Sequence, residues 1–156
     1  MIDNDPWNTE LTPELQIERE SLLANIEEAF SEVNRLGGVS WGESVVYDNY
    51  GSPEQAQRAR AQDNERSWRD LVDDPNWTCC PGVGGFNFLD PIGFRYYLPV
   101  AMMRVLQDGD DEVLGSLSRG WEKHRDVFDE TQLACIERFT TFLQSVEAHR
   151  LVEEGW

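Results

Sequence analysis

Residues 88–99 read Phe-Leu-Asp-Pro-Ile-Gly-Phe-Arg-Tyr-Tyr-Leu-Pro and open the most apolar stretch of the chain. Asp90 before Pro91 is a typical helix start, because aspartate caps free backbone N–H groups and proline suits the first helical turn. Apolar residues then recur at helical spacing, at Phe94, Tyr97, Leu98, Ala101, Met102, Val105 and Leu106. Pro99 lacks an N–H group and clashes with the carbonyl of Arg95, so we expect a kink or a break there. The stretch predicts a buried helix at the centre of an all-α fold.

The aromatic and charged residues of this stretch have a structural and a functional interpretation. The structural one places Phe94 and Tyr97 in the core, where a buried tyrosine hydroxyl needs a hydrogen-bond partner. Arg95 then pairs with one of the many carboxylates of the chain. In the functional one, Arg95, Tyr96 and Tyr97 grip an anionic ligand. We favour the structural interpretation, because a satisfied buried network is the commoner use of such residues.

Helix-start signals mark the other helices on both sides of this stretch. They lie at Thr12-Pro13, Ser52-Pro53, the acidic turn from Asp108 to Glu112, and Asp129. Gly37-Gly38 is expected to end the first helix, and the helix after Ser52 is expected to be anchored late, at Trp68, Leu71 and Val72. Residues 121–128 carry no clear pattern. The whole reads as about five helices packed in two layers.

Two segments between these helices read as irregular. Residues 39–51 are rich in aromatic and β-branched side chains and predict a short hairpin or an ordered loop. Residues 73–88 contain two prolines and the run Gly82-Val83-Gly84-Gly85, which is typical of a loop. A phosphate-binding loop is disfavoured, because no strand clearly precedes the glycines and no Gly-Lys-Ser/Thr follows. We therefore expect a single helical domain over residues 12–150, with a loose arm at 1–11 and a short acidic tail at 151–156.

The stretch from Phe88 to Pro99 also resembles a known pattern. An uncharacterised bacterial family of similar length has the hallmark Phe-Leu-x-Pro-x-x-Phe-Arg-Tyr-Tyr-Leu-Pro. Trp68-Arg69-Asp70-Leu71 resembles a Trp-x-x-Leu stretch of that family, and residues 132–143 resemble its Gln-led terminal helix. The resemblance covers roughly residues 65–145. It implies an all-α fold and no particular chemistry.

Charge is the feature that narrows the function most. Thirty acidic residues against thirteen basic ones give the 156-residue chain a formal net charge of −17, whereas a net charge magnitude of about 2–8 keeps a small domain soluble. This excess argues against direct binding to nucleic-acid phosphates and to anionic membranes, since both attract lysine and arginine. We expect a negative field directed at a basic protein partner.

The residues that could carry catalysis or hold a metal are few. Lys123 is the only lysine, and His124 beside it is a conceivable general base. Cys79, Cys80 and Cys135 fit neither a disulfide framework nor a zinc spacing. We expect no cofactor and no metal. The sequence does not decide whether the chain is an enzyme, and we favour a protein that is not. With no signal peptide and no apolar run of about 20 residues, a cytoplasmic location is expected.

The expected interface lies in the two irregular segments. Its aromatic anchors are Trp41, Tyr47, Tyr50 and Trp77, and its flanking acids are Glu43, Asp48, Asp73 and Asp74. Aromatic side chains at the centre of an interface supply most of its affinity, and surrounding charges speed capture. The leading hypothesis is an immunity protein that masks the active cleft of a bacterial toxin.

Three alternatives to this hypothesis stay open. One is a nucleic-acid mimic that inhibits a DNA-binding enzyme. Another is an enzyme of unrecognised type that uses Arg95, Tyr96 and His124. The last is an adaptor domain whose acidity reflects its host.

Overall fold

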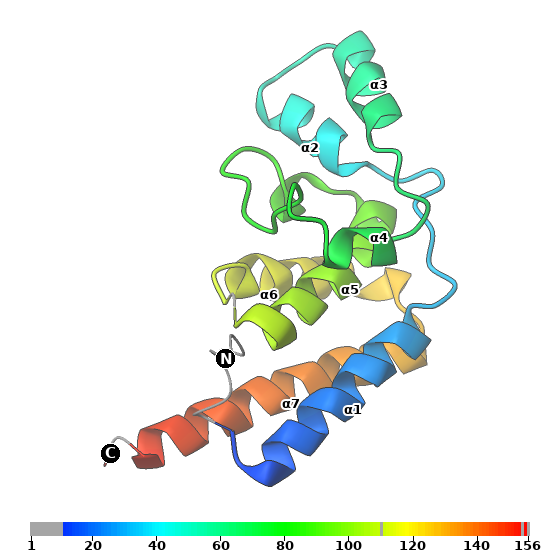
Figure 1. Ribbon diagram of the computed structural model, residues 1–156. Coiled ribbons are helices and arrows are strands. Elements are labelled where there is room, and N and C mark those ends of the chain that lie inside the picture. Colours follow the sequence, from blue (N-terminus) through cyan, green and yellow to red (C-terminus); the bar gives the residue numbers. More distant parts are fainter. Residues whose placement is uncertain (1–10, 110, 154, 156) are drawn as a thin grey trace.

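The computed structural model describes residues 11–109, 111–153 and 155, and within them the chain is a single all-α domain, as the sequence predicts (Figure 1). Seven α-helices and two single 3-10 turns are present in this part of the chain, rather than about five helices. The helices are α1 (Pro13–Ala29), α2 (Trp41–Asp48), α3 (Pro53–Gln62), α4 (Arg69–Val72), α5 (Pro91–Asp108), α6 (Leu114–Lys123) and α7 (Glu130–Glu153). The 3-10 turns are η1 (Phe86–Phe88) and η2 (Arg125–Val127).

Helix starts follow the predicted caps. The side chain of Thr12 accepts a hydrogen bond from the N–H of Leu15, and Asp90 accepts one from the N–H of Gly93. Each cap satisfies a backbone donor that the first turn of a helix leaves free. Helix ends were harder to predict: α1 stops at Ala29, eight residues before Gly37, and the buried ring of Phe30 follows it.

Helix α5 is the centre of the fold. Twelve of its eighteen residues are buried, and Phe94, Tyr97 and Leu98 have no exposed surface. The helix runs unbroken through Pro99 to Asp108, so the predicted break does not occur. Gly109, in the left-handed region at φ 70°, ends it.

The prediction of a hairpin or loop at residues 39–51 is wrong. Ser40 and Glu43 form a complete capping box, and residues 41–48 are helix α2. Of the side chains that suggested a strand, Trp41 is buried in the core, Val45 and Val46 are half-buried, and Tyr47 and Tyr50 are exposed. The expected long helix after Ser52 is divided into α3 and the single turn of α4.

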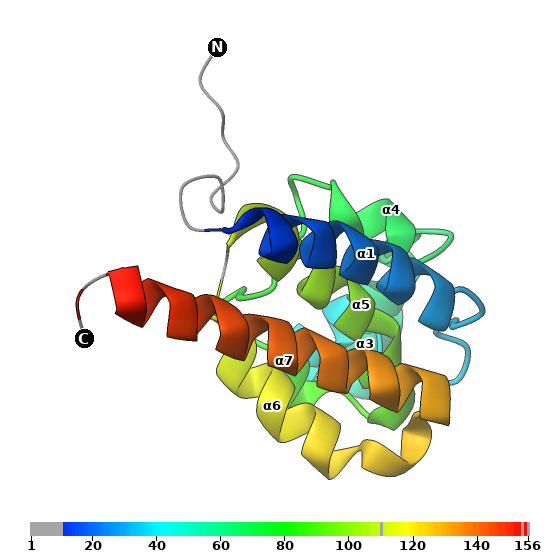
Figure 2. The ribbon, with the colours of Figure 1, turned by 90° about the horizontal axis from the view of Figure 1, so that it is seen from below.

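The helices lie in layers. Helices α1 and α7 run antiparallel side by side at one end, α5 and α6 lie in the middle, and α2 and α3 lie at the far end (Figure 1). Seen from below, α7 lies between α1 and α6 (Figure 2). No helix among the described ranges is both long enough and apolar enough to cross a bilayer.

The described residues begin and end close to the predicted limits of the domain, at residues 12 and 150. Residues 1–10 of the expected arm lie outside the described residues, and Leu11 is buried in the core. Helix α7 continues to Glu153, so residues 151–153 of the expected tail are helical. Residues 154 and 156 also lie outside the described part.

Candidate functional site

Trp41 and Trp77, the two expected anchors, are buried. They are 8% and 7% exposed, and their ring centroids lie 4.7 Å apart. Trp77 also stacks on Tyr97, whose hydroxyl accepts a hydrogen bond of 2.8 Å from the backbone N–H of Trp41. The expectation that both rings stand in exposed loops is wrong, because Trp41 begins α2 and both rings complete the core around α5. In this conformation neither can enter a partner's pocket.

Glu43 belongs to a buried network rather than to an open surface. Its carboxylate accepts hydrogen bonds from the guanidinium of Arg60 at 2.6 Å and from the N–H of Ser40 at 3.0 Å. The Tyr47 hydroxyl donates a third at 3.2 Å. Burial alone would raise the pKa of Glu43, but these hydrogen bonds outweigh it and lower the pKa below its usual value. The network holds α2 against α3.

Asp48 fastens the glycine-rich loop. Its carboxylate accepts a 2.7 Å hydrogen bond from the N–H of Gly84, and the hydroxyl of Ser44 accepts one from Gly85. The N–H groups of Gly84 and Gly85 are therefore already satisfied by side chains of α2. Gly84 has φ 77°, and a Cβ there would lie 2.6 Å from the backbone N of Val45, so glycine is required at this close approach.

Two of the predicted aromatic anchors do face solvent. Tyr47 is 44% exposed and Tyr50 is 96% exposed. Tyr50 is the one non-glycine residue of the described ranges with positive φ, at 56°, a conformation that costs about 1–2 kcal/mol. We call these two exposed tyrosines, Tyr47 and Tyr50, the α2 edge.

Asp73 and Asp74 follow α4 directly, in the turn that leads to Trp77. Asp73 is exposed, and the carboxylate of Asp74 accepts a hydrogen bond from the N–H of Asn76, which closes a turn. Arg104 donates to the carbonyl oxygens of Leu71 and Asp74 and covers the Trp77 ring at 5.0 Å. Asp74 thus has a local structural role.

The residues of the alternative catalytic site do not converge. Arg95 donates to the carbonyl of Val127 at 3.1 Å, and no ion pair of Arg95 is found among the described residues, contrary to the predicted pairing with an acid. Tyr96 donates to Glu65 at 3.2 Å. His124 is buried against the Phe94 ring at 5.3 Å, and burial, followed by the charge of Lys123, lowers its pKa. Arg95 and Tyr96 therefore bond to different segments of the chain, and His124 packs against a core ring.

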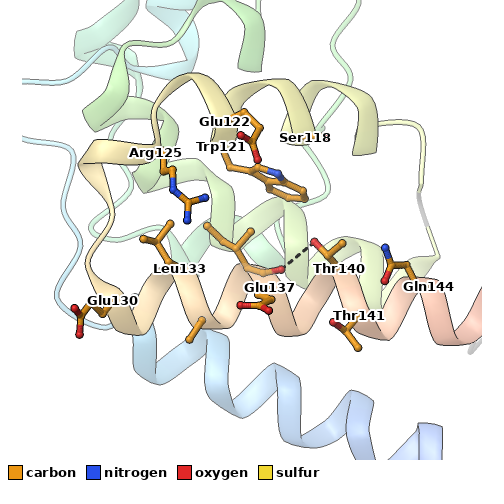
Figure 3. A pocket seen from close by; sticks show the side chains of 12 residues that line it. Ser118, Trp121, Glu122, Arg125, Glu130, Leu133, Glu137, Thr140, Thr141 and Gln144 are labelled. Atoms are coloured by element: carbon orange, nitrogen blue, oxygen red, sulfur yellow. Dashed lines mark hydrogen bonds between the residues drawn. The ribbon is translucent and has the colours of Figure 1, made fainter.

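A groove that the sequence did not indicate runs between α6 and α7 (Figure 3). Its volume is about 770 Å³. The half-buried ring of Trp121 and the side chain of Arg125 point into it from one side, and Leu133 and Thr140 line it on α7 (Figure 3). Trp121 packs edge-on against Phe139 in the core, with ring centroids 6.4 Å apart, which fixes the floor.

The groove combines an apolar floor with an acidic rim. Trp121, Leu133 and Ile136 supply the floor. Glu122, Glu130 and Glu137 are exposed acids among its lining residues, against one base, Arg125. Such a groove suits a segment that is apolar on one face and basic on the other. The sequence contains one signal for this groove, the polar residues on a second face of α7. Only the position of α6 in the fold shows that this face lines a groove.

In the described part of the chain, no group of three or more His, Cys, Asp or Glu residues is placed to hold a metal ion.

A model of a family of unknown function, DUF6714, matches residues 18–153. No curated protein and no solved structure matches the chain.

Proposed function

We propose that this chain, which belongs to the DUF6714 family of unknown function, is an acidic binding protein that captures and neutralises a basic protein partner in the cytoplasm. The observation that carries the proposal is the groove between α6 and α7, with its apolar floor and its rim of Glu122, Glu130 and Glu137. The net charge of −17 supplies the long-range attraction.

Each part of the groove has a separate role in this proposal. The Trp121 ring and the side chain of Leu133 anchor the apolar face of the partner segment. The rim acids meet its lysines and arginines and set the orientation and the rate of capture. The α2 edge, with the exposed rings of Tyr47 and Tyr50, is a second contact surface at the other end of the molecule.

The finer proposal is an immunity protein of a bacterial family, which masks the basic cleft of a toxin. Support comes from charge complementarity: toxins that act on nucleic acids need basic clefts, and this chain is acidic. We also propose that the string from Phe88 to Pro99 is characteristic of the family. Its residues carry the central helix α5, in which Tyr96, Tyr97 and Leu98 are buried.

The test uses a labelled 20-residue helical peptide of leucine and lysine with one apolar face, and a scrambled peptide of equal charge. We expect the amphipathic peptide to bind more tightly and to change the tryptophan fluorescence of the wild-type protein more than that of a Trp121→Phe variant, since Trp121 is one of six tryptophans. The triple variant Glu122→Gln, Glu130→Gln, Glu137→Gln should weaken binding about tenfold, because three exposed ion pairs of about 0.5 kcal/mol each sum to roughly that factor.

A matched variant separates the groove from the overall field. Glu20, Glu28 and Glu32 are exposed acids of α1 and the turn after it. Helices α1 and α6 lie on opposite sides of α7 (Figure 2). Changing these three to glutamine removes the same charge and should reduce affinity much less. Equal losses in both triple variants would contradict the groove and favour a nucleic-acid mimic, in which acids act together along an extended face.

A further inference from the structure

A second pocket, beside α3, brings together three of the thirteen basic residues of the chain. Its volume is about 600 Å³, within the range of about 300–1,000 Å³ of small-molecule sites. It is lined by Asn34, Arg35, Leu36, Gln57, Arg60, Ala61, Glu65, Arg66 and Tyr96. Three arginines and one glutamate line it, and the carboxylates of Glu43 and Asp70, which lie outside the lining, pair with Arg60 and Arg66.

The inner arginines of this pocket are fixed by the fold. Arg35 donates to the carbonyl of Asp63 at 2.7 Å, and its side chain is only 14% exposed. Arg60 donates to the carbonyl of Gly38 and to Glu43. Because these contacts hold both side chains in place, a ligand would not have to order them on binding.

The carboxylates nearby do not close the pocket. Glu43 is buried behind Arg60 and is occupied by Ser40 and Tyr47. Glu65 accepts the hydroxyl of Tyr96, and the Nε of Arg35 lies 3.3 Å away without making a hydrogen bond of its own. Burial, followed by the charge of Glu65, raises the pKa of Tyr96, so its phenol stays protonated and donates to Glu65.

The outer wall supplies further donors and a small apolar surface. Arg66 is 93% exposed in its side chain and lies 3.9 Å from Asp70, a loose pair that a ligand can replace. The lining also contains the amides of Asn34 and Gln57 and the apolar side chains of Ala61 and the 80% exposed Leu36. Guanidinium groups bind carboxylates and phosphates by paired hydrogen bonds.

We infer that this pocket binds a small-molecule dianion with a short apolar body, either a phosphate monoester or a dicarboxylate. Its oxygens replace Asp70 as the partner of Arg66 and contact the exposed part of the Arg60 guanidinium, and the apolar body packs on Leu36 and Ala61. The overall negative field repels anions, so binding rests on short-range contacts with the arginines. This site is separate from the groove between α6 and α7 and does not depend on the function proposed for that groove.

The experiment titrates the protein with phenyl phosphate, phenylsuccinate and the monoanion benzoate, and follows backbone and arginine Nε–H resonances by NMR. We expect saturable shifts at Arg35, Arg60 and Gln57 with one or both dianions, and weaker ones with benzoate. The dianion that binds more tightly identifies the ligand class. No saturable shifts with either dianion, or benzoate binding as tightly as they do, would overturn the inference.

Two arginine variants provide the matched comparison. Arg66→Gln removes an exposed lining residue, and Arg58→Gln removes an exposed arginine of α3 that is not part of the lining. Arg66→Gln should weaken the dianion about tenfold, the loss of one charge-assisted contact, and Arg58→Gln should leave it within about twofold. Equal weakening in both variants would show a general charge effect and would reject the site.

Discussion

At the scale of single residues, partners far along the chain decide what a side chain does. Trp41 and Glu43 have the composition of an interface, since tryptophan and acids are both common there. Tyr97, fifty-six residues away in sequence, binds the N–H of Trp41, and Arg60 binds Glu43. Sequence alone places these residues in one segment, but it does not reveal the partners that bury them.

Glu43→Gln should lower the free energy of unfolding by about 2 kcal/mol at pH 7, because the neutral amide replaces a buried carboxylate that accepts hydrogen bonds from Arg60, Ser40 and Tyr47. The pKa of Glu43 is lowered from its ordinary 4.5. A carboxylate whose pKa is lowered by folding stabilises the protein fully at pH values above its ordinary pKa. That stabilisation is lost as the pH falls through the lowered pKa. Urea unfolding should therefore show the difference between wild type and variant narrowing below pH 4.5.

The control for this prediction is Glu28→Gln, an exposed acid on α1. Its effect should stay within about 0.5 kcal/mol at all pH values. A difference between wild type and Glu43→Gln that is constant from pH 7 to pH 3 would contradict the role of the ionised carboxylate.

At the scale of elements, capping chemistry was the reliable signal. Thr12, Ser52 and Asp90 begin α1, α3 and α5 where the sequence predicts them, because a cap is a local contact with a backbone N–H two or three residues away. Helix α2 was missed although Ser40 and Glu43 form a capping box. Its valines and aromatic residues favour a strand by propensity, and tertiary packing overrides that preference.

Gly120→Ala in α6 should destabilise the protein by about 1–3 kcal/mol, the usual cost of overpacking a core. A Cβ at this position would lie 1.9 Å from Cε2 of the Phe94 ring. Gly115 in the same helix is exposed, and the nearest atom to its Cβ would be an Arg119 nitrogen at 3.4 Å. Gly115→Ala should therefore stabilise by about 0.5 kcal/mol through helix propensity.

Thermal unfolding of the two glycine variants checks this pair of expectations. Both variants replace glycine by alanine in the same helix, so helix propensity favours both equally. Stability changes of opposite sign would therefore show the effect of core packing at Gly120. Stabilisation by both alanines would mean that α6 does not press on the Phe94 ring.

At the scale of the whole molecule, several of the thirteen basic residues hold elements together. Arg138 of α7 pairs with Glu18 of α1 at 2.6 Å, and Arg69 of α4 pairs with Glu27 of α1. Arg35 and Arg60 pair with Glu65 and Glu43 around α3. Basic residues used in this way neutralise particular acids between elements, while exposed acids remain on α1, α6 and α7.

The net charge predicts that the molecular surface is acidic, but it does not predict where on that surface a binding site lies. The total of −17 follows from composition alone. The groove at Trp121 depends on how α6 lies against α7, and the arginine-lined pocket depends on the turn that brings Arg35 to Arg60. Neither arrangement leaves a periodic signal in a single sequence.

Self-repulsion of the acids makes stability depend on ionic strength. Raising NaCl from 10 to 150 mM shortens the Debye length from about 30 to 8 Å, which screens distant like charges more than ion pairs in contact. We expect the Tm to rise, by about 2–4 °C for each 1 kcal/mol recovered. The variant with glutamine at Glu20, Glu28 and Glu32, whose net charge is −14 instead of −17, should have a higher Tm at 10 mM NaCl and a smaller rise. A Tm that falls with added salt would show that the contact pairs, such as Arg138 with Glu18, outweigh the repulsion among the acids.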